Sequence, residues 1–322
     1  MTSAPANLAK RLALLGGGLL AAFGLLEAAC QALYACGVAP QLAAQRNDPA
    51  HYYEASDDPV LAYRLKPGCR IEKDGRSIRI NRYGFRDDRD DLDAGASVAL
   101  LGDSVPFGIA LSQDETPAAA LQRQLGVGIR VLNFGVPGYG LEELRRHTEE
   151  MISLCRPDRV YYVLNLNDFS VRGTVSEGGD NGLYRMYVQP RLKSPFLLRK
   201  AIYRFMKGGR MSSVRWYRWL YEGNKTKLLP FIREMAAFAR AQGSEFAVVL
   251  FPPAVAYADG RFALQDVFDE ISGFLRDNQI PVLAPVAEFG SDVWGLQDAT
   301  DHLTAAGSEV LARAIGQDFA KE

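Results

Sequence analysis

The chain has 322 residues, of which 48% are hydrophobic and 23% charged, a composition typical of a globular protein that buries a full core without covalent cross-links. Lys and Arg together number 37 and Asp and Glu 38, and the resulting net charge of −1 argues against a nucleic-acid-binding protein, which would carry a basic excess. Four cysteines are too few for a disulfide scaffold. With three histidines and no Cys-x-x-Cys or His-x-x-x-His pair, a zinc site is not expected.

The N-terminal segment differs from the rest of the chain. Lys10 and Arg11 precede a mostly apolar run, residues 12–34, which is long enough to cross a bilayer. Glu27 then lies toward the far interface, where a carboxylate costs less than at the centre. Because the basic pair stands on the short N-terminal side, the positive-inside rule places residues 1–11 in the cytoplasm. This predicts a single-pass anchor in the inner (cytoplasmic) membrane with the bulk of the chain on the exported side.

Two other interpretations of this segment stay open. A cleaved signal peptide has the same basic start and apolar run, and small residues at Ala28 and Ala29 are compatible with cleavage. A buried helix of a soluble protein is the third possibility. The choice also affects Cys69 and Cys155, which could pair in an oxidising compartment or remain two separate thiols.

Residues 35–94 are polar and rich in turn-forming residues. We interpret them as a lead-in segment that packs on the main domain through short strands. The charged run 86–93 within it is interpreted as a solvated loop. The main domain is expected to occupy residues 95–322.

Within 95–322, short apolar runs alternate with amphipathic segments. Continuous apolar strands that alternate with helices predict an α/β fold with a parallel sheet covered on both faces. The expected strands are Ser97–Leu101, Arg130–Asn133, Arg159–Leu164, Glu245–Phe251 and Pro281–Ala284. The expected helices are Pro117–Leu125, Leu141–Leu154, Lys227–Ala241, Ala263–Asp277 and Ala305–Phe319.

Residues 170–226 interrupt this alternation and are interpreted as an insertion after the third strand. The segment is basic and aromatic. It fits either a lid or a membrane-interface patch, since Trp, Tyr and basic residues favour that depth, or an amphipathic helix that packs on the domain.

Parallel sheets of this kind bind ligands beyond the carboxyl ends of their strands, which directs attention to the residues that follow each strand. Ser104 follows the first strand, where a serine is well placed to act as a nucleophile. Gly135, Gly138 and Gly140 follow the second strand, where a glycine either offers an unobstructed backbone N–H to an oxyanion or forms a tight turn. Asn165 and Asn167 follow the third strand, where an Asn amide is either a second kind of oxyanion donor or a helix N-cap.

A histidine stands close to two carboxylates near the C-terminus. His302 directly precedes the last expected helix, and Asp298 and Asp301 are its acidic neighbours. A nearby carboxylate can orient an imidazole and stabilise its protonated form. The other two histidines, His51 and His147, are expected on the surface.

The order of Ser104, Gly138, Asn167 and His302 resembles the four sequence blocks of the SGNH/GDSL hydrolase superfamily. The resemblance covers roughly residues 55–322, and the segments 101–108 and 131–140, with 80–87 upstream, look like its bacterial membrane-anchored branch. It implies a flavodoxin-like three-layer α/β/α sandwich, here preceded by a transmembrane helix. It implies no metal and no organic cofactor.

The resemblance also implies a role for each block residue. Ser104 would be the nucleophile and His302 the general base and then acid. The Ser104 and Gly138 N–H groups and the Asn167 side chain would form the oxyanion hole. Gly138 is preferred to Gly135 because the family places this glycine five residues after the Asn of its block, here Asn133.

The chain departs from the family pattern in two places. The family commonly has Asp three residues before the His, a position occupied here by Ala299. We favour Asp298 as the orienting carboxylate, with Asp301 as the alternative, because adjacent side chains usually point apart. The third block usually begins with Gly and here begins with Asn165, which is expected to alter the pocket wall rather than the chemistry.

These features predict an exported, membrane-anchored serine esterase that hydrolyses acyl esters, such as acetyl esters, of carbohydrate or lipid through an acyl-enzyme. An O-acyltransferase acting on an envelope polysaccharide would use the same residues. A non-catalytic module that binds polysaccharide or an assembly partner is the alternative from another class. The sequence indicates no protein partner.

Overall fold

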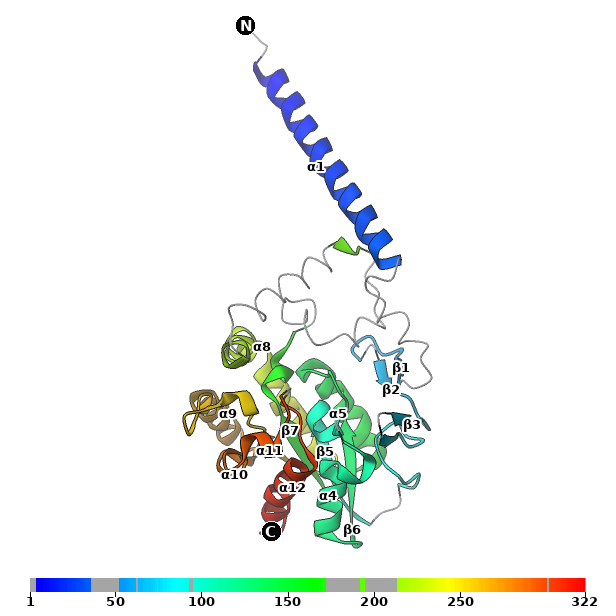
Figure 1. The fold of residues 1–322 in the computed structure, drawn as a ribbon, viewed down its shortest axis with the longest axis vertical. Coiled ribbons are helices and arrows are strands. Elements are labelled where there is room, and N and C mark those ends of the chain that lie inside the picture. The colour runs from blue at the N-terminus through cyan, green and yellow to red at the C-terminus, as the bar shows by residue number, and fades with distance from the viewer. Residues whose placement is uncertain are drawn as a thin grey trace.

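The computed structural model describes residues 4–35, 52–61, 63–73, 75–92, 95–109, 111–171, 192–194, 213–299 and 301–321. A long N-terminal helix, α1 (Ala4–Ala35), extends from an α/β body that contains all the described strands (Figure 1). The strands are β1 (Tyr53–Ala55), β2 (Tyr63–Leu65), β3 (Arg70–Lys73), β4 (Arg76–Arg79), β5 (Ala96–Gly102), β6 (Ile129–Gly135), β7 (Arg159–Leu164), β8 (Glu245–Leu250), β9 (Tyr257–Ala258), β10 (Arg261–Phe262) and β11 (Val282–Leu283). The remaining α-helices are α3 (Ser104–Phe107), α4 (Pro117–Leu125), α5 (Leu141–Cys155), α8 (Ser213–Ala241), α9 (Gln265–Asp277), α10 (Val286–Gly290), α11 (Val293–Leu296) and α12 (Ala305–Phe319), and the 3₁₀ helices are η1 (Gln113–Glu115), η2 (Leu166–Phe169) and η4 (Ala254–Ala256).

Five parallel strands form the central sheet, in the spatial order β11-β8-β7-β5-β6. Counted along the chain this is the order 2-1-3-4-5 in reverse, which is the flavodoxin-like arrangement. The predicted fold class is therefore confirmed. β5 pairs with both β6 and β7, so the residues that follow these three strands meet at one edge of the sheet.

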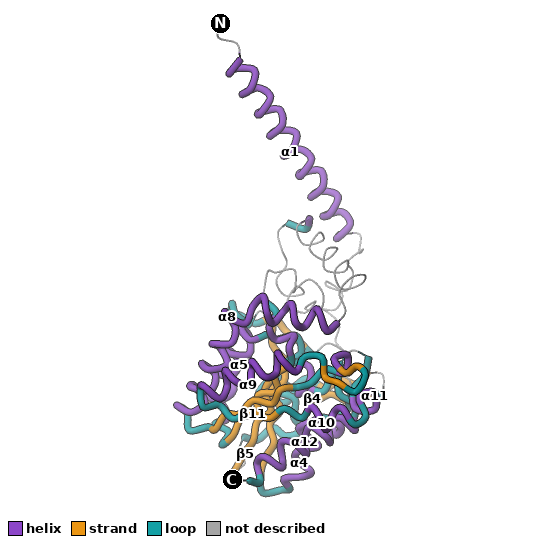
Figure 2. The backbone as a smooth tube through the Cα atoms, turned by 90° about the vertical axis from the view of Figure 1, so that its left-hand side faces the viewer, coloured by secondary structure: helices purple, strands orange, loops and turns teal. Residues whose placement is uncertain are grey.

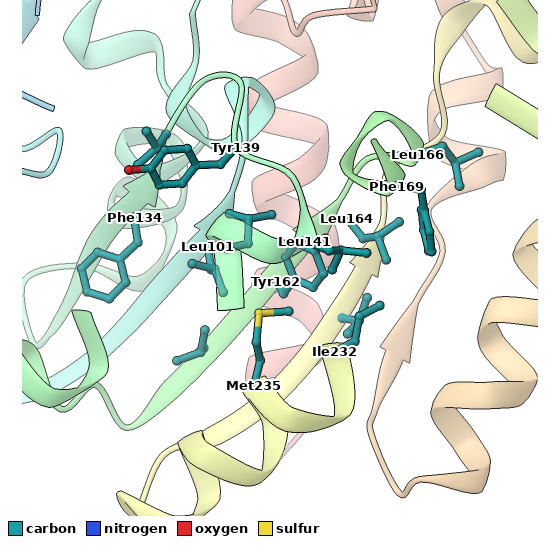
Figure 3. Close-up of a cluster of buried hydrophobic side chains, with 14 of the residues drawn as sticks. Leu101, Phe134, Tyr139, Leu141, Tyr162, Leu164, Leu166, Phe169, Ile232 and Met235 are labelled. Carbon is teal, nitrogen blue, oxygen red and sulfur yellow. The ribbon is translucent and has the colours of Figure 1, made fainter. Parts of the chain in front are cut away.

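Helices cover both faces of this sheet. Side chains of a strand alternate between its two faces, so each strand contributes apolar side chains to both layers of helices. On β5, Ala99 and Leu101 belong to the apolar cluster that includes α5, α8 and α9, whereas Val98 and Leu100 belong to the cluster that includes α4 and α12. Figure 2 shows the strands between these two groups of helices. Figure 3 shows strand residues of the first cluster facing the side chains of α8.

The predicted strands and helices of the domain are all present, with one large difference in length. α8 begins at Ser213, far ahead of the predicted start at Lys227, and continues unbroken to Ala241. The early part of this helix carries buried aromatic side chains, among them Trp216, Tyr217 and Tyr221. For residues 213–226 the packed-helix interpretation of the insertion is therefore correct. Residues 172–191 and 195–212 of the insertion lie outside the described part of the chain.

The lead-in segment packs on the sheet domain through short antiparallel pairs, β1 with β2 and β3 with β4. Its apolar side chains join the same cluster as the sheet, for example Tyr63, Ile80 and Phe85. Cys69, in this segment, and Cys155, at the end of α5, are free thiols in the structure.

Residues 88–91 are exposed, as the interpretation of 86–93 as a solvated loop predicts, but Arg86 is an exception. Its side chain is 2% exposed and donates hydrogen bonds to the carbonyl oxygens of Phe107, Gly108 and Leu111, at 3.0, 2.8 and 2.8 Å. Burial lowers the pKa of this guanidinium to about 10. These carbonyl groups lie at the end of α3 and in the turn that follows it, and a guanidinium with five N–H donors binds several of them at once.

The N-terminal helix contains a stretch, Lys10–Leu33, that is long and apolar enough to cross a membrane. A signal sequence near an N-terminus meets the same criterion. The leucines of this stretch are exposed, so they have no apolar partner within the described body.

Gly135, the last residue of β6, allows α3 to lie directly on the sheet. A Cβ atom at this position would come within 2.3 Å of the Phe107 backbone nitrogen and 2.7 Å of its Cα. Both are backbone atoms of the helix that begins with Ser104, so they have no side-chain freedom with which to move away.

We expect Gly135→Ala to lower the free energy of unfolding by about 3 kcal/mol, because the added methyl group must displace α3 from the sheet. Urea unfolding of the full-length protein in detergent measures this. Gly273→Ala is the matched control: it lies within α9 with open space around its Cβ position and should raise stability by about 0.5–1 kcal/mol. Equal effects of the two substitutions would contradict the close packing inferred at Gly135.

Candidate active site

Ser104 stands at the carboxyl edge of the sheet, as the first residue of α3 and two residues after the end of β5. Asp103 begins this short helix, since its Oδ1 accepts a hydrogen bond from the Val105 N–H at 3.0 Å. Ser104 is 7% exposed.

His302 reaches Ser104 from the loop before α12. Its Nε2 lies 2.9 Å from Ser104 Oγ, although the two residues are 198 positions apart in the chain. Thr304 begins α12 by accepting the Gly307 N–H, which fixes the helix start just after His302. Two residues predicted as nucleophile and base are thus within hydrogen-bond distance, which is the arrangement needed to transfer the serine proton to an imidazole.

A buried carboxylate joins the nucleophile to the predicted amide donor. Oδ2 of Asp103 accepts from Asn167 Nδ2 at 2.9 Å and from Ser104 Oγ at 3.2 Å. The serine hydroxyl has one proton, and its shorter contact is the one with His302. Sequence analysis assigned no role to Asp103, although its place between Gly102 and Ser104 was the available signal.

The two candidate glycines of the second block have different environments. The Gly135 N–H donates to Asn133 Oδ1 at 3.0 Å, so this N–H is already hydrogen-bonded within the end of β6. Gly138 has φ 84° and lies in a turn closed by the Tyr139 N–H on the Val136 carbonyl at 3.2 Å. Pro at the second position and a positive φ at the third fit a type II turn. Gly138 is partly exposed between buried neighbours.

The two aspartates near His302 have different partners. Asp301 accepts from the Val255 N–H through Oδ1 at 3.1 Å and from the Tyr217 hydroxyl through Oδ2 at 3.0 Å. Both carboxylate oxygens of Asp301 therefore bind the loop before α12 to η4 and α8. Burial raises the pKa of Asp301. Asp298 Oδ1 accepts the backbone N–H of His302 at 3.1 Å, so its carboxylate lies against the histidine's own backbone.

Asp168 lies beneath the site and is fully buried. Its Oδ2 accepts from the Tyr162 hydroxyl at 2.7 Å and from the Asn165 N–H at 3.2 Å. Burial, reinforced by the nearby charge of Asp103, raises the pKa of Asp168 well above its usual range. Asn165, which stands where the family has Gly, is the residue that precedes η2 and is itself buried.

Among the described residues, no group of three or more His, Cys, Asp or Glu side chains is placed to hold a metal ion. The structure brings together a serine, a histidine, a buried carboxylate and an asparagine amide.

No protein-family model matches the chain, and no curated protein matches it. Among solved structures it is similar to TesA (15% identity, 70% of this chain and 98% of that one, TM-score 0.47). It is also similar to a lipolytic protein of the G-D-S-L family from Veillonella parvula (12%, 70% and 100%, 0.46) and to a catalytic mutant of Axe2, an acetylxylan esterase from Geobacillus stearothermophilus (18%, 70% and 94%, 0.45).

His147 corrects a sequence-based expectation, since it is 4% exposed rather than on the surface. It lies on the buried face of α5 with Leu144 and Met151, a spacing of three and four residues that was visible in the sequence. Its ring packs edge-on against Tyr139, 5.6 Å between centroids, behind the Gly138 turn. Burial lowers the pKa of His147 to about 4.

This depressed pKa predicts that the protein loses stability as the pH falls from about 6.5 to about 4, because the unfolded chain binds a proton at His147 that the folded chain does not. The loss attributable to His147 is about 3 kcal/mol. Urea unfolding at pH 7 and pH 4 measures it, with His147→Gln as the non-titrating control. If wild type and His147→Gln changed equally with pH, a neutral buried His147 would be ruled out.

Proposed function

We propose that this chain is a serine esterase of the SGNH/GDSL superfamily, and that it hydrolyses acyl esters through an acyl-enzyme. The observation that carries the proposal is the 2.9 Å contact between Ser104 Oγ and His302 Nε2 at the carboxyl edge of the parallel sheet. A binding module has no need for this contact, because neither group gains affinity for a ligand by binding the other.

Each step of the reaction has a residue to perform it. His302 Nε2 takes the Ser104 proton while Oγ attacks the ester carbonyl, and the N–H groups of Ser104 and Gly138 with the Asn167 amide stabilise the oxyanion. His302 then gives the proton to the leaving alkoxide, and the acyl group stays on Ser104. A water molecule, deprotonated by His302, releases the acid and restores the serine.

Asp298 is the carboxylate that we assign to His302. Both oxygens of Asp301 accept bonds from η4 and α8, which gives that residue a structural task. Asp298 lies against the His302 backbone and is the acidic residue that can stabilise the imidazolium as it forms.

We also propose that α1 is a retained membrane anchor with the esterase domain on the exported side, acting on acyl esters of carbohydrate or lipid. Support comes from Glu27, whose two carboxylate oxygens accept the N–H groups of Lys193 and Ser194 at 2.7 and 2.8 Å. Cleavage near Ala28 would remove the partner of these two N–H groups, so the contact favours retention over cleavage.

In the full-length protein in detergent, Ser104→Ala should reduce p-nitrophenyl acetate hydrolysis by several orders of magnitude, because it removes the nucleophile. Asp298→Ala should reduce kcat by about 10²–10⁴, through a misoriented imidazole. Steady-state kinetics and labelling by a fluorophosphonate measure both effects.

Asp301→Asn is the control for the carboxylate assignment. It keeps an oxygen for Val255 or Tyr217, so stability falls while kcat stays within about tenfold of wild type. A larger loss of kcat in Asp301→Asn than in Asp298→Ala would reverse the assignment. A folded wild type that neither turns over nor reacts with the probe would reject the esterase, whereas labelling without turnover would indicate acyl transfer.

The anchor is tested by expressing the full chain with a C-terminal tag in a bacterial host. We expect the protein in the membrane fraction after carbonate extraction, with the tag accessible to protease in spheroplasts, since the apolar stretch of α1 is long enough to span. Intact-mass analysis should recover the N-terminal residues. A soluble product that begins just after Glu27 would identify a cleaved signal instead.

A further inference from the structure

A tyrosine of the lead-in segment reaches the back of the Gly138 turn. Tyr63, on β2, is 1% exposed, and its hydroxyl donates to the Pro137 carbonyl oxygen at 2.8 Å across 74 positions of sequence. Its ring also packs on that of Tyr139, with 5.2 Å between centroids. The reaction described above does not use Tyr63.

The accepting carbonyl and the Gly138 N–H belong to one peptide unit. No peptide bond of the described chain is cis, so the Pro137 carbonyl and the Gly138 N–H point in opposite directions within one plane. The Tyr63 hydroxyl therefore lies behind the backbone donor that we assign to the oxyanion hole.

The orientation of this peptide is the property that distinguishes two kinds of turn. Types I and II differ by a half-turn rotation of the central peptide, here Pro137–Gly138, and proline at the second position suits both. Glycine at position 138 has access to either backbone conformation, and the observed φ of 84° corresponds to type II. A rotated peptide would turn its N–H away from the site and would break the bond to Tyr63.

We propose that Tyr63 is a positioning residue for the oxyanion hole: its hydroxyl holds the Pro137–Gly138 peptide in the orientation that presents the Gly138 N–H to the reacting ester. The bond also polarises the peptide, since a carbonyl that accepts a hydrogen bond makes its own N–H a stronger donor. This inference rests on the proposed esterase function. It gives the lead-in segment a part in catalysis without contact to the substrate.

The test is Tyr63→Phe in the full-length protein in detergent, assayed with p-nitrophenyl acetate. We expect kcat to fall about 10- to 100-fold with KM within about threefold, because the peptide donor acts on the charge that develops in the transition state. The rate of fluorophosphonate labelling should fall with kcat, since the phosphonyl oxygen uses the same hole.

Tyr139→Phe is the matched control. The Tyr139 hydroxyl donates to the Tyr63 carbonyl oxygen at 2.5 Å, so this variant loses one buried hydrogen bond of the same cluster without releasing the Pro137 carbonyl. Both variants should lower the unfolding midpoint alike, whereas kcat in Tyr139→Phe stays within about threefold of wild type. Equal kcat losses in the two variants, or a wild-type kcat in Tyr63→Phe, would overturn the proposal.

Ser104→Ala, run beside them, separates the two levels of inference. If Ser104→Ala keeps full activity, the esterase mechanism itself fails. If it is inactive while Tyr63→Phe is unaffected, the inference about Tyr63 fails alone. Should Tyr63→Phe not fold, ring-fluorinated tyrosine at position 63 keeps the shape and strengthens the donor. A raised kcat then supports the proposal, and an unchanged kcat overturns it.

Discussion

The hydrogen bonds of the buried Asp103 carboxylate fix the arrangement of the residues at the carboxyl edge of the sheet. Its Oδ1 accepts the Val105 N–H that begins α3, and its Oδ2 accepts from Asn167 and lies 3.2 Å from Ser104 Oγ, whose single proton serves the closer contact with His302. Burying a carboxylate is costly unless its oxygens accept hydrogen bonds, so the Val105 N–H and the Asn167 amide that bind Asp103 have a structural role. The serine that follows β5 and the asparagine that follows β7 are thereby held in one arrangement.

This arrangement requires the backbone of α3 to lie very close to the end of β6, and two unlike residues make that possible. Gly135 leaves room for the Phe107 backbone, and Arg86 donates to the carbonyl groups of Phe107 and Gly108 at the end of α3. The first removes a steric obstacle and the second compensates the desolvation of the backbone. Because Arg86 comes from the lead-in, this segment is part of the support of the site rather than a linker.

Two acidic groups are buried at or beneath the site, where burial and mutual repulsion oppose the ionisation of Asp168. Asp103 and Asp168 are both fully buried, and Asp168 has its pKa raised by burial and by the charge of Asp103. Two ionised carboxylates so close together in a medium of low dielectric constant would repel strongly. The Tyr162 hydroxyl, which donates to Asp168, supplies a neutral partner that does not add to this charge.

Local sequence patterns were enough to predict the fold and the candidate site residues. Alternation of apolar strands with helices predicted the parallel sheet, and the polar residues after the strands predicted Ser104, Asn167 and His302 as site residues, because parallel strands end at a common edge. The tertiary structure alone decided what depends on contacts between distant segments: the burial of Arg86, the bonds that occupy Asp301, and the bond from Tyr63 to the Pro137 carbonyl. Periodicity carries no information about such contacts, because a charged or polar side chain in a turn looks the same in sequence whether water or a distant carbonyl satisfies it.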